Sequence, residues 1–299
     1  MRKGYLTGLT VVGFWAAFML VSRLGLAGPT ALSPWDILAL RLAAASLTLA
    51  PFCGGLGREV WGSWRVWTLA ALGGPAYGLT VYWGFRLAPA THGALLFPGV
   101  LPFAAAFLGW ALLGARPGAA QWRGLGLVAL GLACLSWVSW SGGAGEGVRA
   151  GDALFLAAAL SWALYGVLAR RWGVAAWTLT RAAAVCAAAL YLPVYALWLP
   201  KGLAGAGWPE LAGQALYHGV VTTVLVMWLY LRAQESLGPA RMGALMALVP
   251  AVSGGLAALL LGEELPPALA VGLASVSAGA WLASGAAKPS TGRSVPCPT

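Results

Sequence analysis

Arg41 is a charged residue about a third of the way into the apolar run 35–54, five positions after Asp36. If this run crosses a membrane, the charge costs roughly 2.5–3.5 kcal/mol on insertion scales, so the side chain should face protein or water. One interpretation is a counter-ion for a substrate carboxylate or phosphate. The alternatives are an arginine that extends its head group to the membrane surface, or one that ties helices together through helix-end carbonyls. Arg181, in the run 176–199, is its expected counterpart nearer the inner surface.

Aromatic side chains form a second group that could bind a ligand. Those deep within apolar runs could stack on flat, amphipathic or cationic small molecules, or make cation–π contacts with them. Trp and Tyr near the ends of runs are expected at bilayer interfaces instead. The aromatic residues that we expect to line a cavity are Trp15, Phe18, Tyr77, Tyr82, Phe97, Trp162, Tyr165 and Trp228.

Proline and glycine inside apolar runs form a third group. Pro98, Gly99 and Pro102 lie close together in the run 92–114, and Pro250 is followed by two glycines in the run 240–262. Each proline removes a backbone donor and disturbs the carbonyl one turn earlier, so these runs are expected to be broken helices. We therefore expect Pro98, Pro102 and Pro250 to line a substrate site. The alternative is that they only kink helices for packing.

Composition indicates what surrounds these groups. The chain has 299 residues, of which 60% are hydrophobic and 9% charged, whereas soluble domains carry about 25% charged residues. So few charges predict an integral membrane protein surrounded by lipid. The net charge of +10 comes from arginines spaced singly or in pairs between apolar runs, which is the positive-inside pattern and not a nucleic-acid surface. The four cysteines form no disulfide or metal pattern, and no cofactor is implied.

Runs of roughly 20 mixed apolar residues favour helices over membrane strands. We predict an all-α integral membrane protein with ten transmembrane helices. The predicted spans are 4–26, 35–54, 66–87, 92–114, 120–140, 152–172, 176–199, 211–233, 240–262 and 266–285. The predicted organisation is a first five-span unit (1–140), a Gly-rich outer linker (141–151), a second five-span unit (152–285) and a polar cytoplasmic tail (286–299).

The chain repeats itself at an offset close to half its length, which suggests two structural repeats. The matching positions include Pro102 with Pro250, Gly124 with Gly272, Gly131 with Gly279, and Leu112-Leu113-Gly114 with Leu260-Leu261-Gly262. Other spans repeat at nearly the same offset, as Trp15 with Trp162 and Gly73 with Gly219 do. Because each half has an odd number of spans, the second half must cross in the opposite direction. The prediction is an inverted repeat, a design that recurs among transporters.

Charge distribution gives the expected orientation. With the N-terminus inside, twelve Lys and Arg residues fall on the inner side and four on the outer side. This bias predicts cytoplasmic termini. Three Lys against fifteen Arg and a single Ile indicate GC-rich coding, so we expect the inner membrane of a bacterium.

The fourth span of each half, with its proline and its Leu-Leu-Gly ending, resembles the drug/metabolite transporter superfamily of the EamA type. Val249-Pro250 through Leu260-Leu261-Gly262-Glu263-Glu264 is similar to that family's P…LLGE element, and Ala115-Arg116 departs from it in the first half. Trp15, Trp162 and Arg41 also look like family positions. The resemblance covers residues 4–285. It implies a transporter, often an exporter that uses the proton gradient, for amino acids, other metabolites, drugs or nucleotide sugars.

The function we expect is export of small metabolites, such as amino acids or related amphipathic compounds, by alternating access coupled to protons or to exchange. The expected protein is not an enzyme and acts as a monomer or homodimer. The alternatives are a membrane-embedded enzyme acting on lipid-linked substrates, or a channel. An enzyme would favour motifs such as HExxH, and a channel would favour charged rings; the sequence has neither.

No carboxylate is expected at midplane; His92 and His218 could carry protons or make structural hydrogen bonds. Glu263-Glu264 could cap a helix or form an outer gate.

Overall fold

The computed structural model describes residues 2–27, 32–114, 116, 118–141 and 145–285, and within these ranges the secondary structure is helical, without strands. Part of the predicted linker (142–144) and the predicted tail (286–299) lie outside the described residues. The first half comprises α1 (Arg2–Ala27), α2 (Pro34–Leu49), η1 (Ala50–Cys53), α3 (Arg58–Trp61), α4 (Trp64–Ala71), η2 (Leu72–Ala76), α5 (Tyr77–Leu87), α6 (Ala90–Leu113) and α7 (Ala119–Ser141). The second comprises α8 (Glu146–Arg171), α9 (Ala176–Trp198), η3 (Leu203–Gly205), α10 (Trp208–Gln214), η4 (Ala215–Leu225), α11 (Val226–Leu237), α12 (Pro239–Met246), α13 (Val249–Leu261) and α14 (Pro267–Gly285).

Most of the predicted spans are helices of membrane-crossing length. Among the described residues, eight helices are long and apolar enough by length and composition: Arg2–Ala27, Pro34–Cys53, Ala90–Leu113, Ala119–Val138, Glu146–Arg171, Ala176–Trp198, Trp208–Leu237 and Arg241–Leu261. The other two predicted spans correspond to the consecutive helices α4, η2 and α5, and to the shorter apolar helix α14. The protein is therefore an all-α membrane protein, and the count of ten spans stays a prediction.

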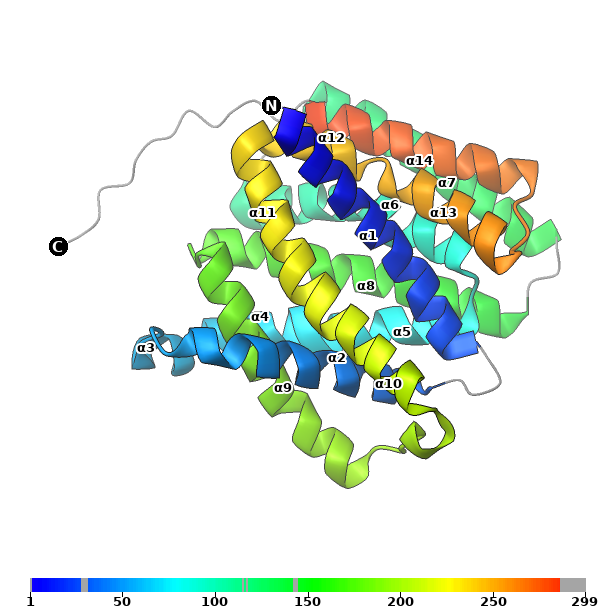
Figure 1. The fold of residues 1–299 in the computed structure, drawn as a ribbon. Helices are drawn as coiled ribbons and strands as arrows, with labels where there is room; N and C mark the ends of the chain where they lie inside the picture. The colour runs from blue at the N-terminus through cyan, green and yellow to red at the C-terminus, as the bar shows by residue number, and fades with distance from the viewer. Residues whose placement is uncertain (1, 28–31, 115, 117, 142–144, 286–299) are drawn as a thin grey trace.

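The helices α7 and α14 pack side by side, and their contact reveals the inverted repeat (Figure 1). A Cβ atom at Gly124 would lie 2.7 Å from the carbonyl oxygen of Gly279, and one at Gly279 would lie 2.8 Å from that of Gly124. Gly131 and Gly272 make the matching pair, at 3.0 and 3.2 Å. Gly124 corresponds to Gly272 and Gly131 to Gly279 in the sequence repeat. Exchanging the two halves therefore converts one contact into the other, as a twofold relation requires.

Contacts between the other helices follow the same symmetry. α8 packs against α5 and α6, and α1, its counterpart, packs against α11 and α13. Likewise α2 packs against η4, while α9 packs against α4 and η2. In Figure 1 the dark-blue α1 and the yellow α11 cross the same face of the molecule. The first two spans of each half thus contact the third span of the other half. Helices of both halves therefore surround the space between them.

The repeated Leu-Leu-Gly ending has a backbone cause. α6 ends at Gly114 with φ 68°, and α13 ends at Gly262 with φ 67°. Both values lie in the left-handed region, where a side chain would be strained, so glycine terminates the helix in each half. The two glycines are therefore kept by the same local geometry.

Irregular helix geometry occurs in the third span of each half. η2 and η4 are π-helical segments, and Gly73 and Gly219, which correspond in the repeat, lie in them. The expected break in the fourth span is wrong for the first half, because α6 stays one helix across Pro98 and Pro102. In the second half the helix is interrupted between α12 and α13, just before Pro250. π-Helical segments often accompany functional sites.

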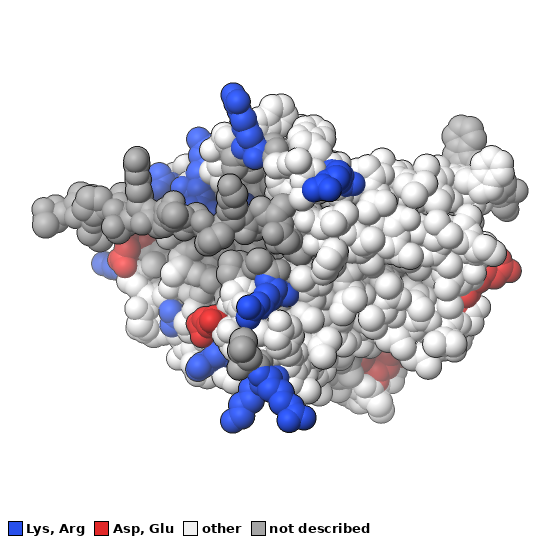
Figure 2. Space-filling view, turned by 90° about the horizontal axis from the view of Figure 1, so that it is seen from above, with Lys and Arg blue, Asp and Glu red and all other residues white. Residues whose placement is uncertain are grey.

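Figure 2 shows that Lys and Arg side chains on one face gather toward one end of the molecule, while a broad area carries neither sign of charge. A large uncharged band with basic residues beyond it fits a protein that crosses a bilayer. The orientation of the termini stays a prediction.

Candidate functional site

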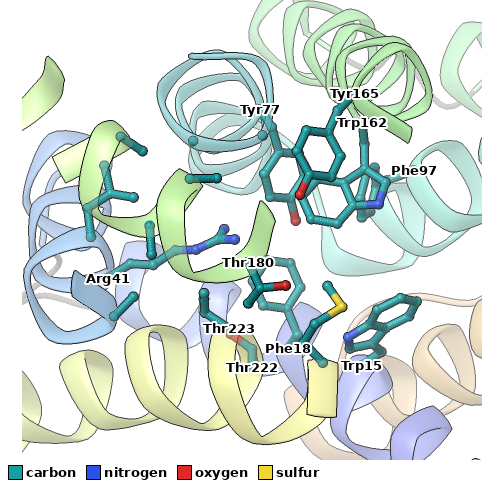
Figure 3. A pocket seen from close by; sticks show the side chains of 18 of the residues that line it. Trp15, Phe18, Arg41, Tyr77, Phe97, Trp162, Tyr165, Thr180, Thr222 and Thr223 are labelled. Atoms are coloured by element: carbon teal, nitrogen blue, oxygen red, sulfur yellow. The ribbon is translucent and has the colours of Figure 1, made fainter. Parts of the chain in front are cut away.

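A cavity of about 120 Å³ lies between the two halves (Figure 3). Its wall draws on both halves, from α1, α2, η2, α5, α6, α8, α9, η4, α11 and α13. The lining residues are Trp15, Phe18, Met19, Arg41, Leu42, Ala45, Gly73, Gly74, Tyr77, Phe97, Pro98, Leu101, Trp162, Tyr165, Thr180, Ala183, Ala184, Ala187, Thr222, Thr223, Met227 and Val249.

The structure brings together most of the residues predicted to bind a substrate. Eight of the twelve line the cavity: Trp15, Phe18, Arg41, Tyr77, Phe97, Pro98, Trp162 and Tyr165. They come from five helices that are far apart in sequence, and the inverted-repeat packing places them around one space. Their role in binding stays a prediction.

The other four predicted residues do not line the cavity. Tyr82 is fully buried outside the wall, and its hydroxyl lies 3.2 Å from Nδ1 of His218. Trp228 is 45% exposed on the molecular surface, where the guanidinium of Arg232 lies 5.4 Å from its ring centroid. Pro102 and Pro250 lie next to lining residues in α6 and α13 but are not themselves part of the wall. A helical position one residue away from a wall points about 100° around the helix, so it misses the cavity.

Arg41 is the charged residue of the cavity wall. Its side chain is almost fully buried, and Figure 3 shows the guanidinium directed into the cavity. The Cζ atom lies 5.1 Å from the ring centroid of Tyr77, and the phenol groups of Tyr77 and Tyr82 are close enough to interact with the charge. Nη1 is buried and has no hydrogen-bond partner. Because a buried donor without a partner is costly, this arrangement suits a group that enters from the cavity.

Four aromatic side chains form a cluster on one side of the cavity, which we call the aromatic wall: Tyr77, Phe97, Trp162 and Tyr165. The ring centroid of Tyr77 lies 4.7 Å from that of Trp162 and 5.3 Å from that of Phe97. Trp162 and Tyr165 are 5.2 Å apart. The separations fall in the range of favourable ring pairs, so the rings hold one another in place and present a rigid apolar surface.

The opposite side of the cavity combines Trp15 and Phe18 with three threonines. Trp15 stacks on Tyr230 with ring centroids 5.8 Å apart and planes inclined by 16°. Thr180, Thr222 and Thr223 were missed by the sequence analysis. A signal for one of them exists, since Thr223 follows Tyr77 at the offset of 146 that also relates Gly73 to Gly219. Their hydroxyls already donate to helix carbonyls, those of Thr222 and Thr223 both to His218 at 2.8 Å, and their oxygens can still accept.

Buried rings fill the space beyond the cavity toward the predicted outer end. Tyr82, Phe85, Phe155 and His218 are all 0% exposed. Phe85 and Phe155 pack edge to face with centroids 4.8 Å apart, and Phe18 meets His218 edge to face at 5.3 Å. We call this set, with Phe18, the aromatic plug. His218 makes a hydrogen bond with the hydroxyl of Tyr82 at 3.2 Å, which is the structural role that was one of the two interpretations of this residue.

Polar contacts at the predicted outer end join α1, α5 and α6 to the segment that follows α13. Glu263 accepts hydrogen bonds from the backbone N–H groups of Ala90 and Thr91, both at 2.8 Å, and so caps α6. Its carboxylate also lies 3.7 Å from Nε of Arg23. Nη1 of the same arginine donates to the carbonyl of Phe85 at 2.6 Å. A carboxylate at a helix N-terminus is favoured by the exposed N–H groups there.

His92 and Asp152 add a second tie at this end, because Nδ1 of His92 lies 2.9 Å from a carboxylate oxygen of Asp152. This contact joins α6 to α8. Asp36 is also structural: it is buried, completes the capping box of α2 with Ser33 and accepts from the hydroxyl of Tyr195 at 2.6 Å. Hydrogen bonds of this kind satisfy a buried carboxylate without a ligand.

In the part of the chain that the structure describes, the cavity wall contains no Asp or Glu, and no cluster of three or more His, Cys, Asp or Glu is placed to hold a metal ion. The wall is thus apolar apart from Arg41 and a few hydroxyls. Such a surface can hold a small organic molecule by burial of its body and by one charged contact.

Comparison with known proteins agrees with this architecture. The model of the EamA-like transporter family matches residues 2–137 and again residues 149–285, one match in each half. The chain belongs to the EamA-like transporter family. It is therefore a membrane transporter built from two repeats of the family's unit.

A solved crystal structure, described only as that of a protein, has the same fold, with a TM-score of 0.61 and 22% sequence identity, covering 94% of this chain and 97% of the other. No curated protein matches the sequence. The structural likeness supports the fold alone.

Proposed function

We propose that this EamA-family member exports small metabolites from the cytoplasm by alternating access, with the cavity between its halves as the substrate site. The supporting observation is that helices of both repeats line one cavity, with the aromatic plug beyond it toward the predicted outer end. Inverted repeats that enclose a central site are the structural basis of alternating access in several transporter folds. The proposed residues for substrate contact are the eight predicted residues in the wall.

The asymmetry between the two sides of the cavity supports this mechanism. Half-buried wall residues such as Trp162, Tyr165 and Thr180 lie toward Arg171 and Ala176, which is the predicted cytoplasmic end. On the other side, the aromatic plug and the contacts of Glu263 pack the halves together. We interpret the conformation as one that admits substrate from the cytoplasm. Release outside would require the plug and the contacts of Glu263 to separate.

Export is proposed to be coupled to the proton gradient or to exchange. No carboxylate lines the described cavity, so a proton carrier would act from outside the wall. His92 pairs with Asp152 across α6 and α8 and so belongs to a contact between the halves outside the wall. Flux measured with and without an imposed pH gradient tests the coupling, and equal rates in both conditions would exclude a proton.

The proposed transport is tested by flux into vesicles. Purified protein in liposomes should move labelled compounds from a metabolite panel faster than protein-free liposomes do, and flux should saturate. Protein in which Glu263 is replaced by Gln should bind compounds but differ in flux, because the contact that closes the outer end is weakened. Absence of flux for the whole panel with correctly inserted protein would refute the proposed function.

The proposed orientation and inner-membrane topology are tested by labelling. In a background without native cysteines, Glu59→Cys in α3 and Glu146→Cys at the start of α8 should react with a membrane-impermeant maleimide from opposite sides of the membrane. Both positions are exposed, so each should label readily. Reaction of both from the same side would contradict five spans per half.

A further inference from the structure

The cavity combines one buried cation with a rigid apolar surface. Arg41 is only 8% exposed, its Nη1 atom is buried without a hydrogen-bond partner, and its guanidinium is directed into the cavity. Beside it stands the aromatic wall, which begins with Tyr77, 5.1 Å from the guanidinium carbon. A ligand that contacts both must carry an anionic group next to a flat apolar body.

Resting on the proposed transport function, we propose that the cavity selects small aromatic or otherwise flat monocarboxylates, with the carboxylate bound by Arg41 and the body packed on the aromatic wall. The guanidinium presents donors in a planar fork that matches the two oxygens of a carboxylate. The low polarity around Arg41 strengthens this pairing, because a buried charge interacts more strongly than one in water.

The charge of the wall separates carboxylates from amines. Arg41 is the charged residue of the described wall, and an ammonium group would find no carboxylate there. Such a group could only contact ring faces and threonine oxygens while being repelled by Arg41. The expected order of affinity for ligands of equal size is therefore monocarboxylate, then neutral amide, then amine. An amino group beside the carboxylate should add nothing to binding.

The size of the cavity limits the body of the ligand. Its volume of about 120 Å³ is close to the ~150 Å³ of an engineered apolar cavity that accepts benzene. Drug-sized ligands occupy pockets of about 300–1,000 Å³. One ring with a short acidic side chain fits this space, whereas a nucleotide sugar does not.

The experiment measures binding to the purified full-length protein by isothermal titration with three ligands of similar size. These are phenylacetate, its neutral amide phenylacetamide, and the cation phenethylamine. We expect phenylacetate to bind about 10- to 100-fold more tightly than phenylacetamide, the range for a charged hydrogen bond in a buried site, and phenethylamine to bind weakest. Equal affinities, or tighter binding of the amine, would overturn the proposal.

Variants of Arg41 distinguish loss of its charge from loss of the folded cavity. Arg41→Gln should reduce phenylacetate affinity to that of phenylacetamide, and the affinity for phenylacetamide should change less than threefold, which shows that the cavity is intact. Arg41→Lys, which keeps the charge but loses the planar fork, should fall between the two. Arg181→Gln removes the arginine in the second span of the other half, which does not line the cavity, and should leave all three affinities unchanged. If Arg41→Gln binds phenylacetate as the natural protein does, the proposal is wrong.

Flux and binding measurements together distinguish failure of the carboxylate site from failure of the proposed transport function. Vesicles that transport phenethylamine but not phenylacetate would leave transport standing and overturn the carboxylate site. Arg41-dependent binding of phenylacetate without flux of any compound would leave the site standing and refute transport.

Discussion

Arg41 and Arg181 occupy the second span of their respective halves, but their surroundings differ. Arg41 is buried at the cavity with Nη1 unpaired. Arg181 lies near the start of α9, half-buried, and donates to the carbonyls of Phe52 at 2.6 Å and Trp177 at 3.4 Å. Its guanidinium also rests 5.7 Å from the centroid of Trp177. Arg181 donates to two carbonyls of the protein, whereas Nη1 of Arg41 has no hydrogen-bond partner.

The repeat therefore sets the arrangement of the helices, and the chemistry of each half depends on its own side chains. Arg181 fits the structural interpretations, since it ties α9 to η1 through a carbonyl near a helix end. Arg41 lacks that contact and faces the cavity, so it retains the capacity to bind a ligand. A buried charge whose hydrogen-bonding capacity is not filled by the protein is a frequent mark of a functional position.

The largest expected effect concerns transport. At a substrate concentration below saturation, Arg41→Met should lower the flux of a carboxylate by about 10- to 100-fold, because a charged hydrogen bond in a buried site is lost. Arg181→Met should lower flux less than threefold. The measurement is uptake by liposomes that contain equal amounts of inserted protein. Equal losses in both variants would remove the functional distinction between the two arginines.

The same two variants should affect stability with opposite signs. Arg41→Met removes a buried charge whose Nη1 atom has no hydrogen-bond partner and should stabilise the substrate-free protein by about 1–3 kcal/mol. Arg181→Met leaves the carbonyl of Phe52 without its donor and should destabilise the protein by about 0.5–1.5 kcal/mol. Denaturant-dependent unfolding in detergent measures both changes. A loss of stability in Arg41→Met would show that Arg41 is held by contacts as favourable as those of Arg181.

The two halves are equivalent where α7 packs against α14, and substitutions there test this equivalence. In Gly124→Ala, the new methyl group would meet the carbonyl oxygen of Gly279 at 2.7 Å, and backbone on both sides limits relaxation. We expect a loss of about 1–3 kcal/mol of unfolding free energy. Gly126→Ala is the matched control, because a Cβ atom there meets nothing within 4 Å. Equal stability of the two variants would argue against the twofold contact.

The smallest effect separates two tryptophans that the sequence placed in the same group. Trp162→Ala should weaken ligand binding about 2- to 10-fold, as expected for loss of one ring contact. Trp228→Ala should change binding less than twofold, since Trp228 is on the surface. Titration of phenylacetate into both variants measures the difference. A larger effect at Trp228 would show that the cavity extends to the surface site.

Much of the fold could be predicted from the order of residues. The scarcity of charged residues indicated a lipid environment. The repeated glycines indicated two units: Gly114 and Gly262 each end a helix, and Gly124 and Gly279 allow two helices to approach closely. Pro98 and Pro102 misled the prediction, because α6 continues through both. A proline removes one hydrogen bond, and packing against neighbouring helices can offset that loss.

The candidate site was predicted in part, and the reason lies in helix geometry. Depth in a span selects residues near midplane, but it does not say which side of the helix faces a cavity. For this reason Tyr77 lines the wall, whereas Tyr82 on the same helix lies in the aromatic plug. Trp162 and Trp228 are both deep in their spans, and only Trp162 meets the cavity.

The membrane environment of this protein, its helical class and its division into two related halves follow from composition and from spacing along the chain. Only the packed structure shows that Nη1 of Arg41 lacks a hydrogen-bond partner and that Arg181 donates to two carbonyls. It also brought Thr180, Thr222 and Thr223 to the wall and the carboxylate of Glu263 to the start of α6. These contacts join residues far apart in sequence, and only the packing of one half against the other brings them within reach.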